Sequence, residues 1–168
     1  MSIEDAGQSR EPKPVPNTPE NVFEQFNMKG KVVAINGSSD GIGFAVAEAI
    51  AEAGGDIALW YNTNDAAIEK GENLAKKHQI RAIAYQVEVT NHDAVEKALR
   101  QVVQDFGKLD VFVANAGMAI SKASTDQTIE EYKKQYAVNG KRSDLPIISV
   151  GPHGACFVYN ITSSETTL

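Results

Sequence analysis

The sequence has little of three features that would place a chain in an oxidising compartment, in a membrane or on nucleic acid. Its only cysteine is Cys156, so a disulfide within the chain is excluded. No apolar run is long enough to span a bilayer, and residues 1–7 lack the hydrophobic core of a signal peptide. The net charge is −6, without a basic block. We therefore expect a cytoplasmic protein that binds neither membranes nor nucleic acids.

The 168 residues, 42% hydrophobic and 23% charged, fit one domain preceded by a polar arm. Residues 1–22 carry four prolines among polar residues, which predicts a flexible arm. From residue 31 onward, apolar runs typical of buried strands alternate with stretches of helical period. The expected strands cover residues 32–35, 56–61, 81–87 and 109–114. The expected helices cover residues 42–53, a stretch capped by Asn64 or Asp65 that runs to residue 77, and a stretch capped by Asn91 or Asp93 that runs to residue 106.

Strand–helix–strand units with short connections favour parallel pairing with right-handed crossovers. We therefore predict an α/β fold with three layers, in which a doubly wound parallel sheet of order 3-2-1-4 lies between helices. The apolar residues expected on the helix faces toward this sheet are Ile42, Ala45, Val46, Ala49, Ile50 and Ala53, then Ala67, Ile68 and Leu74, then Val95, Leu99, Val102, Val103 and Phe106.

Three glycines, Gly37, Gly41 and Gly43, lie between the first strand and the first helix. This layout is typical of a loop that cradles the phosphates of a dinucleotide. Gly37 would make the tight turn, Gly41 would let the backbone approach the pyrophosphate, and Gly43 would let the helix pack close to its strand. A glycine-rich surface turn is the alternative, but the flanking strand and helix favour the nucleotide.

Two motifs stand at the ends of the first and fourth strands: Asn36-Gly-Ser-Ser-Asp-Gly-Ile-Gly43 and Ala114-Asn-Ala-Gly117. They resemble the TGxxxGIG loop and the NAG motif of the short-chain dehydrogenase/reductase family, and the chain is similar to its group of fungal NADPH-dependent sorbose reductases, mannitol dehydrogenases and carbonyl reductases. The resemblance covers residues 20–139 and implies the N-terminal half of a Rossmann fold, truncated at its C-terminus and so incomplete. Asn36 replaces the usual threonine, at a position that mainly braces the backbone.

The end of the second strand favours NADPH over NADH. An NAD-dependent enzyme of this fold carries an acidic residue there for the ribose hydroxyls, whereas this sequence has Tyr61, Asn62 and Thr63. No carboxylate opposes a 2′-phosphate at this place, and Asn62 and Thr63 can donate hydrogen bonds to it. Asp40 is an opposing signal, because NADP-dependent members of the family often have a basic residue at its position.

Glu88 and Val89 follow the third strand, and the resemblance implies that they receive the adenine; a solvent-exposed glutamate is the alternative reading of Glu88. The histidines lack the spacing of metal ligands, so no metal is predicted. The complete set of predicted cofactor-binding residues is Gly37, Ser39, Asp40, Gly41, Ile42, Gly43, Tyr61, Asn62, Thr63, Glu88, Val89, Asn115, Ala116 and Gly117.

Catalysis in this family requires an asparagine, a serine, and a tyrosine and lysine four residues apart, in which the lysine lowers the tyrosine pKa. Asn139, at the end of residues 132–139, matches the catalytic asparagine; an ordinary asparagine at a helix C-terminus is the alternative. Ser163 and Ser164 resemble the serine strand but lie too close to Asn139. No tyrosine in the chain is followed by lysine four residues later.

The resemblance therefore implies an oxidoreductase that reduces a ketose or another carbonyl by hydride transfer from NADPH, represented here by an inactive chain. A non-catalytic nucleotide-binding or interaction module is the alternative. Residues 140–168 lack helical period and family pattern, so we expect an irregular tail after an arm of residues 1–22 and a domain of residues 23–139. The fourth strand would then have an uncovered edge. The homo-oligomer of the family is not assumed for this chain.

Overall fold

The structure is a computed structural model that describes residues 19–123, 125–139 and 158–160. Most of the expected N-terminal arm lies outside these residues. No helix within the described ranges has the length and apolar character needed to cross a lipid bilayer. The elements in chain order are α1 (Val22–Gln25), β1 (Val32–Asn36), α2 (Gly41–Glu52), β2 (Asp56–Tyr61), α3 (Ala66–His78), β3 (Ala82–Gln86), α4 (His92–Phe106), β4 (Val111–Ala114), α5 (Ile129–Asn139) and β5 (Val158–Asn160).

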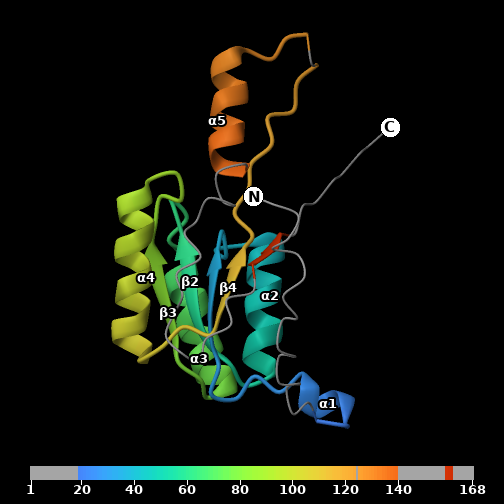
Figure 1. The fold of residues 1–168 in the computed structure, drawn as a ribbon, viewed down its shortest axis with the longest axis vertical. Coiled ribbons are helices and arrows are strands. Elements are labelled where there is room, and N and C mark those ends of the chain that lie inside the picture. The colour runs from blue at the N-terminus through green and yellow to red at the C-terminus, as the bar shows by residue number, and fades with distance from the viewer. Residues whose placement is uncertain (1–18, 124, 140–157, 161–168) are drawn as a thin grey trace, which may run out of the picture.

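A parallel sheet of order β3-β2-β1-β4-β5 forms the centre of the fold (Figure 1). Each neighbouring pair of strands is parallel, and Ile35 of β1 lies opposite Leu59 of β2 on one side and Val113 of β4 on the other. The predicted order 3-2-1-4 is confirmed. Because the chain continues from β1 and β4 in opposite directions, a crevice is expected where these two strands end.

The strand β5 differs from the prediction. Its three residues pair in parallel with β4, with Phe112 opposite Val158 and Ala114 opposite Asn160. They belong to the segment that we expected to be irregular, the rest of which lies outside the described residues. The predicted uncovered edge of β4 is therefore wrong. Three residues are too few to show a periodic pattern, although valine and tyrosine favour strands.

Two hydrophobic cores lie on the two faces of the sheet. Side chains alternate along a strand, so Val32 and Ala34 of β1 pack on the α4 side, whereas Val33 and Ile35 pack on the side of α2 and α3. Figure 1 shows α4 and α2 on opposite sides of the strands. Every residue of β1 is buried, as expected for a central strand covered on both faces. The predicted three-layer Rossmann arrangement is confirmed.

The face that α2 turns toward the sheet agrees only in part with the predicted one, of which Val46 and Ile50 pack against the core. Its buried residues are Gly43, Ala47 and Ala51, whereas Ala45 and Ala49 of the predicted stripe are exposed. Apolar residues occur on almost every side of this helix, so their periodicity does not single out one face. The buried residues are spaced four apart along one ridge of the helix, although alanines of the same size lie on the exposed side.

The predicted faces of α3 and α4 are largely confirmed. In α3, Ala67 and Leu74 are buried, but Ile68 is 47% exposed. In α4 the apolar stripe is buried or, at Val103, packed against the edge of the core. The strongly amphipathic pattern of α4 explains this success, because its polar residues leave only one side able to face the sheet. The buried residues of α4 are Val95, Ala98, Leu99, Val102 and Phe106.

Two substitutions on α2 distinguish its inner face from its outer face. We expect Ala47→Leu to lower the free energy of unfolding by about 1–3 kcal/mol, because the added atoms have no room between α2 and the sheet. Ala49→Leu, on the exposed side of the same helix, should change it by less than about 0.5 kcal/mol. Urea unfolding followed by circular dichroism measures both, and equal effects would contradict the face assigned here.

Candidate functional site

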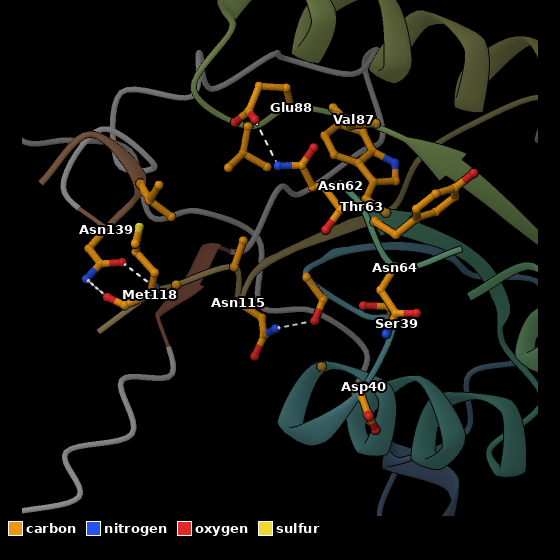
Figure 2. Close-up of a pocket in the computed structure, with 18 of the residues that line it drawn as sticks. Ser39, Asp40, Asn62, Thr63, Asn64, Val87, Glu88, Asn115, Met118 and Asn139 are labelled. Atoms are coloured by element: carbon orange, nitrogen blue, oxygen red, sulfur yellow. Dashed lines mark hydrogen bonds between the residues drawn. The ribbon is translucent and has the colours of Figure 1, made fainter. Parts of the chain in front are cut away.

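A cavity of about 670 Å³ opens at the carboxyl edge of the sheet, where β1 and β4 end (Figure 2). Its walls come from the loop after β1, the ends of β2 and β3, the segment after β4 and the last turns of α5. The lining residues are Gly37, Ser39, Asp40, Ile42, Gly43, Trp60, Tyr61, Asn62, Thr63, Asn64, Val87, Glu88, Val89, Asn115, Ala116, Gly117, Met118, Ala119, Gln135, Val138 and Asn139.

The structure brings together the residues that the sequence predicted. Every predicted cofactor-binding residue except Gly41 lines the cavity, and so does Asn139; their roles toward a ligand stay predictions. Ser163 and Ser164 lie outside the described residues. Several lining residues that were not predicted directly adjoin a predicted one in the chain, so extending each motif by one residue would have found them. These are Trp60, Asn64, Val87, Met118 and Val138, whereas Ala119 and Gln135 carry no such signal.

The loop after β1 has a conformation that requires glycine. Gly37 and Gly41 have φ values of 63° and 58°, in the left-handed region that side chains disfavour. A Cβ atom on Gly43 would lie 2.4 Å from the carbonyl oxygen of Gly37, and one on Gly37 would lie 2.8 Å from the Cα atom of Ala116. The loop, the first turn of α2 and the end of β4 therefore touch backbone to backbone. The surroundings of Gly41 are open.

Asn36 and Asn115 join the ends of β1 and β4. The buried side-chain oxygen of Asn36 accepts hydrogen bonds from the backbone N–H groups of Asn115 (2.6 Å) and Ala116 (2.5 Å). In return, Nδ2 of Asn115 donates to the carbonyl oxygens of Asn36 and Gly37, each at 3.0 Å. The bracing role expected at position 36 is thus confirmed, with an amide in place of the usual hydroxyl.

Asp40 and Lys70 form an ion pair at the glycine loop. Asp40 is the N-cap of α2 and accepts from the Gly41 N–H at 2.9 Å. This hydrogen bond, followed by the ammonium of Lys70 at 3.2 Å, holds the pKa of the Asp40 carboxyl below its ordinary value. Lys70 also donates to the Ser39 carbonyl oxygen at 2.8 Å and lies over the Phe44 ring at 4.6 Å. Lys70 could not be predicted from the sequence, because no local pattern links α3 to this loop.

Glu88 and Asn62 connect the ends of β3 and β2. Nδ2 of Asn62 donates to one carboxylate oxygen of Glu88 at 2.8 Å, and the backbone N–H and hydroxyl of Thr90 donate to the other at 3.1 and 2.9 Å. The Thr90 N–H is the largest of the contacts that hold the pKa of the Glu88 carboxyl below its ordinary value. The Glu88 side chain is exposed, but both of its carboxylate oxygens accept hydrogen bonds from Asn62 and Thr90. Its role toward adenine stays a prediction.

Two side-chain amides attach α5 to the segment after β4. Asn139 accepts from the backbone N–H of Met118 at 2.9 Å and donates to its carbonyl oxygen at 2.8 Å, as the dashed lines in Figure 2 show. Gln135 accepts from the backbone N–H of Ile120 at 3.3 Å. Asn139 therefore lies at the cavity as the last residue of α5, and its catalytic role stays a prediction.

A doubly wound parallel sheet with a glycine loop at its switch point defines a Rossmann-type α/β domain. The model of the short chain dehydrogenase family matches residues 31–142, and the chain belongs to this family of oxidoreductases.

Its relatives include fungal enzymes of sugar and polyol metabolism. It is 51% identical over 107 residues to a probable NADP-dependent mannitol dehydrogenase of Yarrowia lipolytica, and 48% identical over 108 residues to a sorbose reductase of Candida albicans. Each match covers 64% of this chain and 38% of the relative. The chain thus spans well under half the length of these two relatives.

Solved structures of the family superpose on the same region. The NADPH-dependent 3-quinuclidinone reductase from Rhodotorula rubra has a TM-score of 0.72 and 45% identity, and the match covers 78% of this chain and 50% of the reductase. The L-sorbose reductase from Gluconobacter frateurii, solved with NADPH and L-sorbose, has a TM-score of 0.66 and 28% identity, with 71% and 46% coverage.

Substituting two glycines of the loop separates crowding from backbone strain. We expect Gly43→Ala to lower the free energy of unfolding by about 3 kcal/mol, because its Cβ atom would collide with the Gly37 carbonyl. Gly41→Ala should cost about 1 kcal/mol, because only its left-handed backbone is disfavoured. Chemical denaturation measures both variants, and a larger loss at Gly41 would contradict the contact described between Gly37 and Gly43.

Removing the Asn36 side chain tests the connection between the strand ends. Asn36→Ala should lower the free energy of unfolding by about 2 kcal/mol, because two backbone N–H groups lose their shared acceptor. Asn73→Ala, an exposed position on α3, serves as the control and should change it by less than about 0.5 kcal/mol. If Asn36→Ala were as stable as the control in urea unfolding, the connection would contribute nothing to folding.

Proposed function

We propose that this chain binds NADPH in the cavity at the carboxyl edge of its sheet. The observation that carries the proposal is the glycine loop, whose backbone contacts and left-handed residues bring the N-terminus of α2 to the switch point. The free backbone N–H groups at a helix N-terminus commonly bind phosphate groups. The residues present fit a dinucleotide, because Gly37 and Gly43 leave no side chain in the cradle and the remaining walls combine amide side chains with aromatic and aliphatic ones.

The end of β2 supports NADPH over NADH. Tyr61, Asn62 and Thr63 line the cavity at that point, and none of them carries a carboxylate to accept from the ribose hydroxyls. Asn62 is held by Glu88 through one N–H, and its amide has a second N–H to offer. The relatives named as NADP-dependent or NADPH-dependent support the same choice.

We further propose that the site is that of an enzyme type that reduces a ketose or another carbonyl compound, as the names of the sorbose reductase relatives suggest. When bound, NADPH supplies the hydride for such a reaction. Asn115 and Asn139 hold the wall on the β4 side of the cavity in place. Since no Tyr-x-x-x-Lys pair occurs in the 168 residues, we propose that this chain binds NADPH without turnover.

Titration of the 168-residue chain with NADPH tests binding directly. Trp60 is the only tryptophan, lines the cavity and packs edge-on against Phe112 at 5.2 Å, so its fluorescence reports on this site. We expect a saturable change in fluorescence and no oxidation of NADPH when sorbose or fructose is added. Circular dichroism must show a folded chain. A folded chain without a saturable response would overturn the binding proposal, and NADPH oxidation would overturn the proposed inactivity.

A further inference from the structure

The side chains that line the cavity supply no positive charge for the 2′-phosphate of NADPH. The described residues that line it include two carboxylates, Asp40 and Glu88, and neither lysine nor arginine. The N-terminus of α2 can serve the pyrophosphate, and the 2′-phosphate of NADPH belongs at the end of β2. A phosphate at the end of β2 needs a positive charge of its own, supplied from outside the cavity lining.

Lys70 is placed to supply this charge. It extends from α3, and its ammonium contacts the carbonyl oxygen of Ser39 at 2.8 Å and the carboxylate of Asp40 at 3.2 Å, both of them cavity residues. Its side chain is 31% exposed, compared with 78% for Asp40. A lysine ammonium has three N–H donors, so these two contacts leave one donor for a ligand.

The ammonium of Lys70 lies at the end of the cavity where β2 finishes. Ser39 and Asp40 share the cavity with Thr63 and Asn64, the residues that lead from β2 toward α3. Figure 2 shows Ser39, Asp40 and Asn64 at one end of the cavity and Met118 and Asn139 at the other. A phosphate at the end of β2 would therefore lie near Ser39 and Asp40, which Lys70 contacts, and not at the end of the cavity formed by α5.

We propose that Lys70 binds the 2′-phosphate of NADPH and is the residue through which this chain distinguishes NADPH from NADH. The inference rests on the proposed function and assigns the positive charge of the same site. The carboxylate of Asp40 is largely in water, where an ion pair is weak. A doubly charged phosphate competes successfully with it, while the Ser39 carbonyl continues to accept from the ammonium.

NADPH and NADH differ only in the 2′-phosphate. Measuring the dissociation constant of each nucleotide therefore tests this assignment. We expect Lys70→Gln to weaken NADPH binding about tenfold or more and to leave NADH binding unchanged within about twofold, because the variant loses a charge-assisted contact but keeps a donor for Ser39. Lys70→Arg should retain the preference for NADPH. Lys76→Gln, an exposed position on the same helix that pairs only with Glu72 among the described residues, is the matched control and should change neither constant.

Each other result would overturn the assignment. An equal loss of both nucleotides in Lys70→Gln would show that Lys70 only holds the loop through Ser39, and an unchanged NADPH constant would show that it has no role. If the wild-type protein bound both nucleotides equally, or NADH more tightly, the assignment of Lys70 would be overturned. The proposal that the cavity binds a nucleotide would remain. A folded wild-type chain that binds neither nucleotide would overturn the proposed function, and the role of Lys70 with it.

Discussion

The hydrogen bonds between Asn36 and Asn115 hold together the place where the sheet divides, and the cavity depends on them. Ladder pairing between β1 and β4 ends at Ile35 and Val113, just before the chain leaves in two directions. The two amide side chains continue the connection beyond that point. Because they fix the backbone after β4, Gly37 can lie against Ala116 and the first turn of α2 can lie against Gly37. At this place three backbone segments lie in direct contact, which the missing side chains of Gly37 and Gly43 allow.

Both carboxylates of the site act within the protein. Asp40 caps α2 and pairs with Lys70, and Glu88 accepts from Asn62 and Thr90. Neither is an isolated negative charge facing a ligand, and each connects two segments of the cavity wall. This explains how a site with two acidic residues suits an anionic ligand. The carboxylate at position 40, which in the sequence argued against a phosphate, occurs together with a lysine from a different element.

Sequence patterns predicted the features that are local and strongly periodic. The strands β1 to β4 read as apolar runs, their order followed from the helices between them, and the glycine loop was visible from its spacing. The inner face of α2 could not be predicted, because alanine, valine and isoleucine occur on all its sides. The strand β5 was too short to recognise. The contacts of Lys70 with Asp40 and of Asn36 with Asn115 join residues 30 and 79 positions apart, so they depend on packing that no local pattern contains.

The helix α5 differs from the other long helices in what holds it in place. None of its residues is buried, and Ile129, Tyr132 and Tyr136 are largely exposed. Among the described residues, polar side chains along its length attach it to the segment after β4: Glu131 pairs with Lys122, and Gln135 and Asn139 bond to the backbone. A helix held in this way adds little to the cooperative unit formed by the sheet and α2 to α4. The wall of the cavity that α5 forms is therefore held by polar contacts, whereas the glycine loop and the strand ends rest on the buried core.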